Sequence, residues 1–291
     1  MARFPGVYVA VITPFTANDE VDYPRLREHV EWLLSSGIHG LIPTGSCGEY
    51  ASLSDQERAK VVETITGTTA GRAPVIVGTA APSTKRAVYW ANHAKEVGAA
   101  GLMALPPINY RPTKHEVFAY YEALAGVNLP IIVYNNPFDT STDLTPDFLA
   151  ELSQIEQIIG VKEFSGDVRR IPEIQEKTTL EVFAGADDLA LEGLLAGATG
   201  WIAGLTNATP RESVALYNLA VTGKFAEATR LYRRLLPLFR YDSQPILVQT
   251  IKYCLELAGR PAGKTRPPRL ELEEGVRRLI EIAYRDVQAG L

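Results

Sequence analysis

Eight short runs of apolar and β-branched residues recur along the chain, and a longer segment with helical periodicity follows each of them. The runs are apolar at consecutive positions, which is typical of parallel strands covered by helices on both faces. Half-exposed antiparallel strands would alternate apolar and polar positions instead. We therefore predict strands within residues 6–13, 40–44, 73–80, 101–105, 130–135, 158–163, 180–185 and 199–204.

The segments between these runs have the pattern of amphipathic helices. The segment 22–37 has a proline in its first turn and ends at a glycine, and the segment 83–98 starts with a serine and ends at a glycine. Ser54 and Glu57 offer one register of a capping box for a third. The predicted helices include residues 22–37, 52–67, 83–98 and 187–197.

Eight strand–helix units predict a (β/α)8 TIM barrel, and we assign it to residues 1–223 as the catalytic domain. A doubly wound sheet is the alternative, but no Gly-x-Gly-x-x-Gly follows the first strand. Strand patterns stop after residue 223, and three further helical patterns follow. We therefore predict a C-terminal helical domain over residues 224–291, with helices within 224–241, 245–259 and 268–290.

Composition narrows the class of protein. The 291 residues are 46% hydrophobic and 22% charged, with a net charge of −5 and no basic stripe, so nucleic acid is not an expected partner. No stretch of about 18 apolar residues could span a bilayer, and the N-terminal pattern is not that of a signal peptide. Two distant cysteines and four scattered histidines predict neither a disulfide nor a metal site. We expect a cytoplasmic protein without a cofactor.

Catalytic groups of such barrels stand where the strands end. Lys162 ends the sixth predicted strand. A lysine acts as a nucleophile only as a neutral amine. Burial lowers the pKa of a lysine and so favours the neutral amine. Tyr134 ends the fifth strand, where a phenol can move the protons needed to form a carbinolamine. A lysine extending to solvent and a core tyrosine are the structural alternatives.

Two other strand ends carry polar residues. In "TGSCGE", Ser46 and Cys47 lie between glycines, a turn whose N–H groups and hydroxyl can hold a carboxylate, although an ordinary βα turn is the alternative. No histidine stands as a partner for a Cys47 nucleophile. After the seventh strand, "GADD" places Asp187 and Asp188 next to Gly185, either to cap a helix or to face a hydroxyl or amine of a substrate.

These segments together resemble the dihydrodipicolinate synthase / N-acetylneuraminate lyase family of Schiff-base-forming barrels. The opening "GVYVAVITPF", the turn "GSCGEYASLSDQER", "YNNP" and "GVKEFSGD" match it in order and spacing. The resemblance implies that Lys162 forms an imine with a 2-oxo acid, that Tyr134 relays protons, and that Ser46 and Cys47 lie at the substrate carboxylate. It also implies a homo-oligomer, a dimer or tetramer, with a three-helix C-terminal domain.

The sequence departs from the dihydrodipicolinate synthases at positions that the resemblance marks as functional. Asp139 stands where they have an arginine for the carboxylate of the second substrate. Asn109, with Tyr110 beside it, stands where a neighbouring subunit supplies a relay tyrosine. Cys47 replaces the second threonine of the turn. These changes argue against dihydrodipicolinate synthesis.

Several segments look like the 1-pyrroline-4-hydroxy-2-carboxylate deaminases, among them "SGDVRRI", "FAGADD", "GWIAGLTNATPRE" and "LVQTIKYCLELAG". That subgroup is the first expectation. Dehydratases and aldolases of 2-keto-3-deoxy sugar acids, 4-hydroxy-tetrahydrodipicolinate synthase, and a catalytically silent ligand-binding barrel are the alternatives. Lys252 lies in a helical pattern, where we expect a surface or interface charge rather than the imine-forming residue.

Overall fold

The computed structural model of the chain describes residues 3–108 and 110–289. A strand forms within each of the eight predicted runs, and neighbouring strands pair in parallel. The strands are β1 (Gly6–Ala10), β2 (Gly40–Ile42), β3 (Ile76–Gly78), β4 (Gly101–Ala104), β5 (Ile131–Asn135), β6 (Ile158–Glu163), β7 (Glu181–Ala184) and β8 (Gly200–Ala203).

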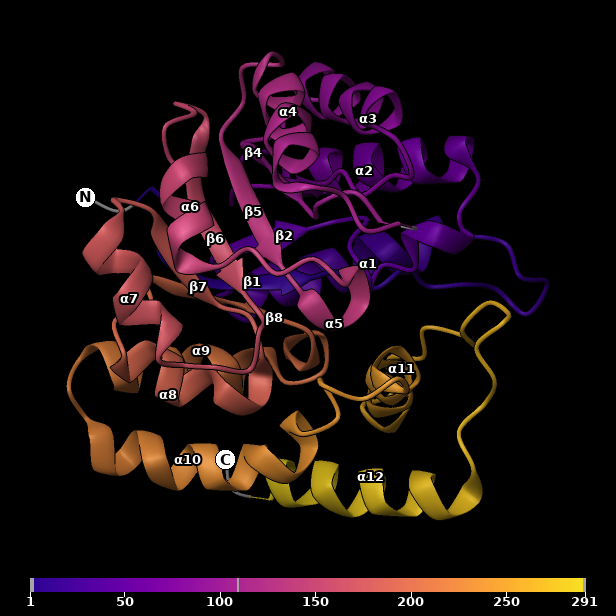
Figure 1. The fold of residues 1–291 in the computed structure, drawn as a ribbon. Coiled ribbons are helices and arrows are strands. Elements are labelled where there is room, and N and C mark those ends of the chain that lie inside the picture. The colour runs from indigo at the N-terminus through magenta and orange to yellow at the C-terminus, as the bar shows by residue number, and fades with distance from the viewer. Residues whose placement is uncertain (1–2, 109, 290–291) are drawn as a thin grey trace.

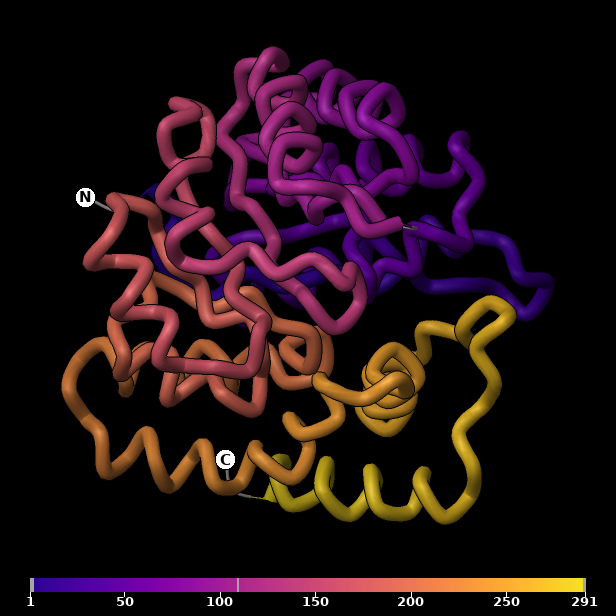
Figure 2. Tube along the Cα trace, viewed as in Figure 1, coloured from indigo at the N-terminus to yellow at the C-terminus, as the bar shows by residue number. Residues whose placement is uncertain are grey.

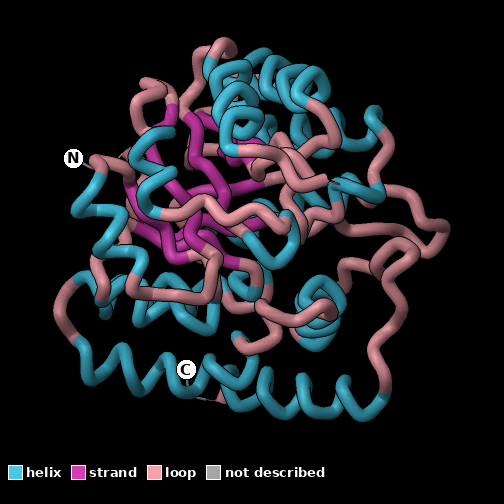
Figure 3. Tube along the Cα trace, in the orientation of Figure 1, coloured by secondary structure: helices cyan, strands magenta, loops and turns pink. Residues whose placement is uncertain are grey.

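The sheet closes on itself, which is the topology of a TIM barrel and not of a doubly wound sheet. Its order is β2-β1-β8-β7-β6-β5-β4-β3, and a parallel bridge between Leu41 and Val75 joins the two ends. Leu41 N also donates to Pro74 O at 3.1 Å, and Gly78 N to Pro43 O at 3.0 Å. In Figure 3 the strands form the centre of the molecule and the helices surround them.

Helices follow the strands as the pattern predicts. The Ser54–Glu57 capping box forms at the start of α2 (Asp55–Thr69). Residues 187–197, predicted as one helix, divide into the 3-10 helix η2 (Asp187–Leu189) and α8 (Ala190–Leu195). The helices around the barrel are α1 (Tyr23–Ser35), α2 (Asp55–Thr69), α3 (Thr84–Glu96), α4 (Lys114–Ala125), α5 (Pro137–Thr140), α6 (Pro146–Leu152), α7 (Arg170–Lys177), α8 (Ala190–Leu195) and α9 (Pro210–Val221), with two more 3-10 helices, η1 (Tyr50–Ser52) and η3 (Leu205–Asn207).

The barrel interior is filled by a cluster of buried side chains separate from the larger cluster between sheet and helices. Alternate strand residues point inward, as the pleat requires. On β5, Ile132 and Tyr134 belong to the inner cluster, and Phe183 on β7 and Ile202 on β8 do so too. The same alternation directs Lys162 inward, because it is paired with Tyr134 and Phe183 on the neighbouring strands.

Three helices follow the barrel: α10 (Phe225–Phe239), α11 (Leu247–Leu257) and α12 (Glu274–Gln288). Figure 1 shows α10 and α12 along one side of the molecule, with α11 nearer the strands. The buried face of α10 includes Phe239, whose ring centre lies 5.4 Å from that of Trp201 on β8. The long connection between α11 and α12 can be followed in Figure 2. The helix α12 begins at Glu274, six residues after the start of the pattern that predicted it.

The division at residue 223 remains a prediction, since the C-terminal helices pack directly on α8, α9, η2 and η3. None of the helices in the described part of the chain is both long and apolar enough to cross a membrane.

Candidate active site

Lys162 and Tyr134 lie side by side where β5 and β6 end. The two residues are paired in the sheet, and Lys162 Nζ lies 4.3 Å from the centre of the Tyr134 ring. The ring of Phe164 is the next aromatic neighbour, at 5.6 Å from Nζ. Both Lys162 and Tyr134 are 6% exposed, so the amine and the phenol share a site that is largely shielded from water.

The pKa of Lys162 is raised, which is opposite to the direction that its position in the sequence suggests. Burial alone lowers this pKa, but the nearby acidic groups Tyr134, Asp242, Cys47 and Asp187 raise it by more in sum. Burial itself raises the pKa of Tyr134, and that of Cys47 to about 12, so both are neutral at pH 7. The resting lysine is therefore an ammonium, and it must pass a proton on before it can attack.

The Tyr134 hydroxyl is held by an amide that the sequence analysis did not single out. Asn136 Nδ2 donates to Tyr134 Oη at 3.2 Å and to Asp139 Oδ2 at 2.7 Å. In return, Asp139 N donates to Asn136 Oδ1 at 3.2 Å. Because Tyr134 Oη accepts this bond, its own proton is free to point elsewhere. Asp139 is thus connected to the phenol through Asn136.

The turn after β2 places Ser46 at partial exposure and Cys47 in a buried position. Glu49 ends the turn in the left-handed backbone conformation, with φ 55°, and is buried. Its carboxylate forms an ion pair with Lys252 at 2.8 Å and accepts a hydrogen bond from Arg266 N at 3.0 Å. The C-terminal region therefore fixes the turn that carries Ser46 and Cys47.

The expectation that Lys252 is a surface or interface charge is wrong, because this residue of α11 is only 4% exposed. Burial lowers its pKa to about 8, against the opposing effect of Glu49. The ammonium also donates to Lys264 O at 2.9 Å. A helical pattern cannot reveal this, because the partner carboxylate lies some 200 residues away in the sequence.

Asp187 is directed into the protein. Trp201 Nε1 donates to its carboxylate at 2.9 Å, and the N–H groups of Gly204 and Leu205 donate at 3.1 Å and 2.6 Å. It joins the end of β7 to the end of β8, an arrangement that favours a positioning role over substrate contact. Asp188 is turned away, with Ser243 Oγ 3.4 Å from its Oδ1. Neither side chain caps the following helix.

Gly185 stands where no side chain fits. A Cβ at this position would lie 2.4 Å from Glu163 O and 3.1 Å from Phe164 Cβ. The residue lets β6 and β7 approach closely next to Lys162, so its contribution to the site is space and not a contact of its own.

A cavity of about 670 Å³ opens beside these strand ends, and we call it the mouth cavity. Of the sequence-predicted residues, Ser46, Tyr110 and Asp139 line it, while Asn109 lies outside the described residues. Lys162 is deeper and is not part of this lining. The mouth cavity also contains two arginines, Arg111 and Arg269, and the latter lies 3.6 Å from Glu49.

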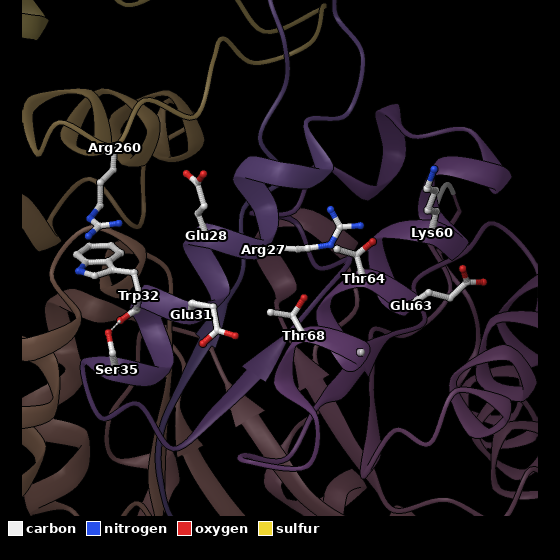
Figure 4. Close-up of a pocket in the computed structure, with 11 residues that line it drawn as sticks. Arg27, Glu28, Glu31, Trp32, Ser35, Lys60, Glu63, Thr64, Thr68 and Arg260 are labelled. Carbon is white, nitrogen blue, oxygen red and sulfur yellow. Dashed lines mark hydrogen bonds between the residues drawn. The ribbon is translucent and has the colours of Figure 1, made fainter.

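A second hollow lies on the outside of the barrel between α1 and α2 (Figure 4). Both acidic and basic side chains line it, and none of the strand-end residues takes part. Within the described ranges, no group of three histidine, cysteine or acidic side chains is arranged to hold a metal ion.

A (β/α)8 barrel with a buried lysine beside a tyrosine at its strand ends has the framework of a class I aldolase-type lyase. The comparison with known families agrees: the chain belongs to the dihydrodipicolinate synthetase family, whose model matches residues 3–284.

Several relatives are similar over nearly their whole length. A 4-hydroxy-tetrahydrodipicolinate synthase of Methanospirillum hungatei is 38% identical over 97% of this chain and 99% of its own. An uncharacterised DapA-like lyase of Rhizobium meliloti is 35% identical over 93% of this chain and 92% of its own. The dihydrodipicolinate synthase of Acinetobacter baumannii, solved with pyruvate, superposes with a TM-score of 0.92 at 30% identity, covering 98% of this chain and 99% of its own. These names do not include the deaminase subgroup that the sequence segments suggest.

Proposed function

We propose that this family member is a Schiff-base lyase that eliminates a hydroxyl from C4 of a single 2-oxo acid or its cyclic imine. The observation that carries the proposal is Asp139, whose carboxylate lines the mouth cavity. This charge disfavours a second carboxylate bound next to Asp139, whereas Arg111 and Arg269 lie elsewhere in the lining of the same cavity. The favoured substrate is 1-pyrroline-4-hydroxy-2-carboxylate, and the hydroxylated 2-keto-3-deoxy sugar acids are the nearest alternatives.

The chemistry follows from the proposed roles of the strand-end residues. Lys162 loses its ammonium proton to solvent, and its amine attacks C2 of the substrate. Tyr134 gives its hydroxyl proton to the group that C2 releases, and it becomes a phenolate as the imine forms. The substrate carboxylate lies on the turn that carries Ser46 and Cys47. The imine acidifies C3, loss of that proton gives an enamine, and the enamine expels the C4 hydroxyl. Hydrolysis then releases the product, which for the pyrroline is 2,5-dioxopentanoate with ammonia.

A second candidate is 4-hydroxy-tetrahydrodipicolinate synthesis from pyruvate and aspartate semialdehyde. The names of the relatives support it. So do Arg111 and Arg269 in the mouth cavity, since either guanidinium can pair with a second carboxylate. The two candidates share the imine at Lys162 and differ in what reacts with the enamine.

A direct comparison of the two reactions tests the proposal. The purified protein is assayed with the hydroxylated pyrroline, following 2,5-dioxopentanoate with a semialdehyde dehydrogenase, and separately with pyruvate and aspartate semialdehyde. We expect turnover in the first assay and negligible condensation in the second. Condensation without product from any C4-hydroxylated substrate would reverse the order of the candidates. If condensation is observed, the Asp139 charge does not prevent it, and Asp139→Arg should then raise the condensation rate only slightly.

A further inference from the structure

Asp242 is a buried carboxyl that the C-terminal region contributes to the site. It follows α10 in the chain and is 7% exposed. Its Oδ2 accepts the backbone N–H of Asp187 at 2.9 Å, which ties it to the end of β7. No part of the proposed mechanism uses this residue, although its ionisation is coupled to the pKa of both Lys162 and Tyr134.

The free oxygen of Asp242 occupies space that a missing side chain leaves at the end of β8. Gly204 continues the inward-facing alternation of Ile202, and a Cβ there would lie only 2.7 Å from Asp242 Oδ1. The same Cβ would lie 3.5 Å from Cys47 Sγ. Asp242 Oδ1 and Cys47 Sγ of the turn after β2 therefore both lie close to Gly204 at the end of β8.

Two adjacent carboxyls share this region, and their surroundings separate their protonation. Burial raises the pKa of Asp187 to about 6, and the three N–H groups that donate to its carboxylate keep the shift from being larger. Asp242 accepts one, and burial together with the Asp187 charge raises its pKa well above the usual range, against the effect of Lys162. Since Oδ2 is occupied as an acceptor, the proton of Asp242 belongs on Oδ1.

We propose that Asp242 is a further catalytic residue, a neutral carboxyl that gives its proton to the hydroxyl leaving C4. The inference rests on the elimination proposed above. In the enamine, the Lys162 nitrogen lone pair restores the C2=N bond, the C2=C3 pair becomes the C3=C4 bond, and the C4–O bond breaks. The leaving oxygen takes the proton from Asp242 Oδ1 and departs as water. The proton that C3 lost earlier, carried by Tyr134, restores the acid.

The test compares leaving groups, because an acid assists the loss of hydroxide and not the loss of chloride. Asp242→Asn keeps an oxygen to accept the Asp187 N–H but has no acidic proton. We expect it to lose water from the C4-hydroxylated substrate roughly 10²–10⁴-fold more slowly, and to lose chloride from the 4-chloro analogue within about threefold of the wild-type rate. The exposed carboxyl of α6, Asp147, gives a matched control, and Asp147→Asn should change neither rate.

Each outcome decides between the proposals. Equal slowing of both leaving groups in Asp242→Asn, or no slowing at all, overturns the role of Asp242 while the elimination stands. Wild-type protein that eliminates from no C4-hydroxylated substrate overturns the proposed function and this inference together. If Asp242→Asn does not fold, Asp242→Ala is assayed with added formate, which should restore the loss of water. Absence of rescue in folded Asp242→Ala contradicts the inference.

Discussion

Among the single residues, Lys162 has to become a nucleophile although its pKa is not lowered. Lys162 has acidic neighbours, and these favour its ammonium form. The ammonium therefore has to lose a proton, and the Tyr134 ring centre lies 4.3 Å from its nitrogen. Asn136 fixes the direction of the phenol by donating to its oxygen. Reactivity then depends on a positioned hydroxyl that exchanges protons with the substrate more than on desolvation of the amine.

After Lys162 itself, the Tyr134 hydroxyl is expected to contribute most to the turnover rate. Tyr134→Phe keeps the ring against Lys162 and removes only the group that moves protons. We expect a folded protein that loses roughly 10²–10⁴ of its turnover rate, the range for a positioned acid or base. Circular dichroism and steady-state kinetics measure the two effects. Near-normal turnover in a folded variant would rule out the relay.

At the scale of elements, the junction between α1, the end of β1 and η3 depends on a neutral histidine. His29 Nε2 lies 3.0 Å from Asn207 Oδ1, which also accepts the N–H of Ile12 at 3.1 Å. Asn207 Nδ2 donates to Ala10 O at 2.8 Å. Since Asn207 Oδ1 can only accept, His29 carries its proton on Nε2. Burial lowers the pKa of His29 to about 4.

This junction should weaken in acid. Between pH 6.5 and about pH 4 the unfolded state binds a proton at His29 and the folded state does not. The stability that the neutral ring provides is present above pH 6.5 and is lost as the pH falls to about 4, by about 3 kcal/mol in full. His29→Gln should show a smaller loss than the wild type over this window in urea unfolding. Identical pH profiles would contradict the assignment.

The strand pattern was sufficient to predict the barrel, because parallel strands and amphipathic helices have local signatures. The neighbouring positions of Lys162 and Tyr134 followed from the order of strands alone. Asn136 could not be recognised, since its role depends on which way one side chain turns after β5. Asp242 and the buried pair of Lys252 with Glu49 depend on packing between distant segments. In the sequence they look like ordinary polar positions of amphipathic helices and loops.

At the scale of the whole molecule, the C-terminal region is part of the site and not an attachment to it. It supplies Asp242 beside the strand ends, Lys252 beneath the turn after β2, and Arg269 in the mouth cavity. Breaking a buried pair such as Lys252 with Glu49 leaves an uncompensated charge, which typically costs about 3–5 kcal/mol. The barrel therefore depends on these helices for both stability and the arrangement of its site.

The fragment 1–223 tests this dependence. Removing α10–α12 uncovers Trp201, leaves Glu49 without Lys252, and leaves the backbone N–H of Asp187 without its acceptor Asp242. We expect the fragment to be insoluble, or to unfold without cooperativity and form no imine. Thermal unfolding followed by circular dichroism, with the full chain as control, measures this. A soluble fragment with a cooperative transition near that of the full chain would show that the predicted domain boundary separates independent units.

Lys162 is the residue expected to form the covalent imine, and borohydride trapping measures this without a coupled assay. The protein is incubated with pyruvate, reduced, digested and mapped by mass spectrometry, with Lys162→Arg treated in parallel. We expect the pyruvate-derived mass on the peptide containing Lys162, and none on Lys162→Arg. A stable adduct at Lys252 would contradict the assignment of the nucleophile. No adduct with any 2-oxo acid, the result expected of a silent ligand-binding barrel, would contradict the Schiff-base mechanism altogether.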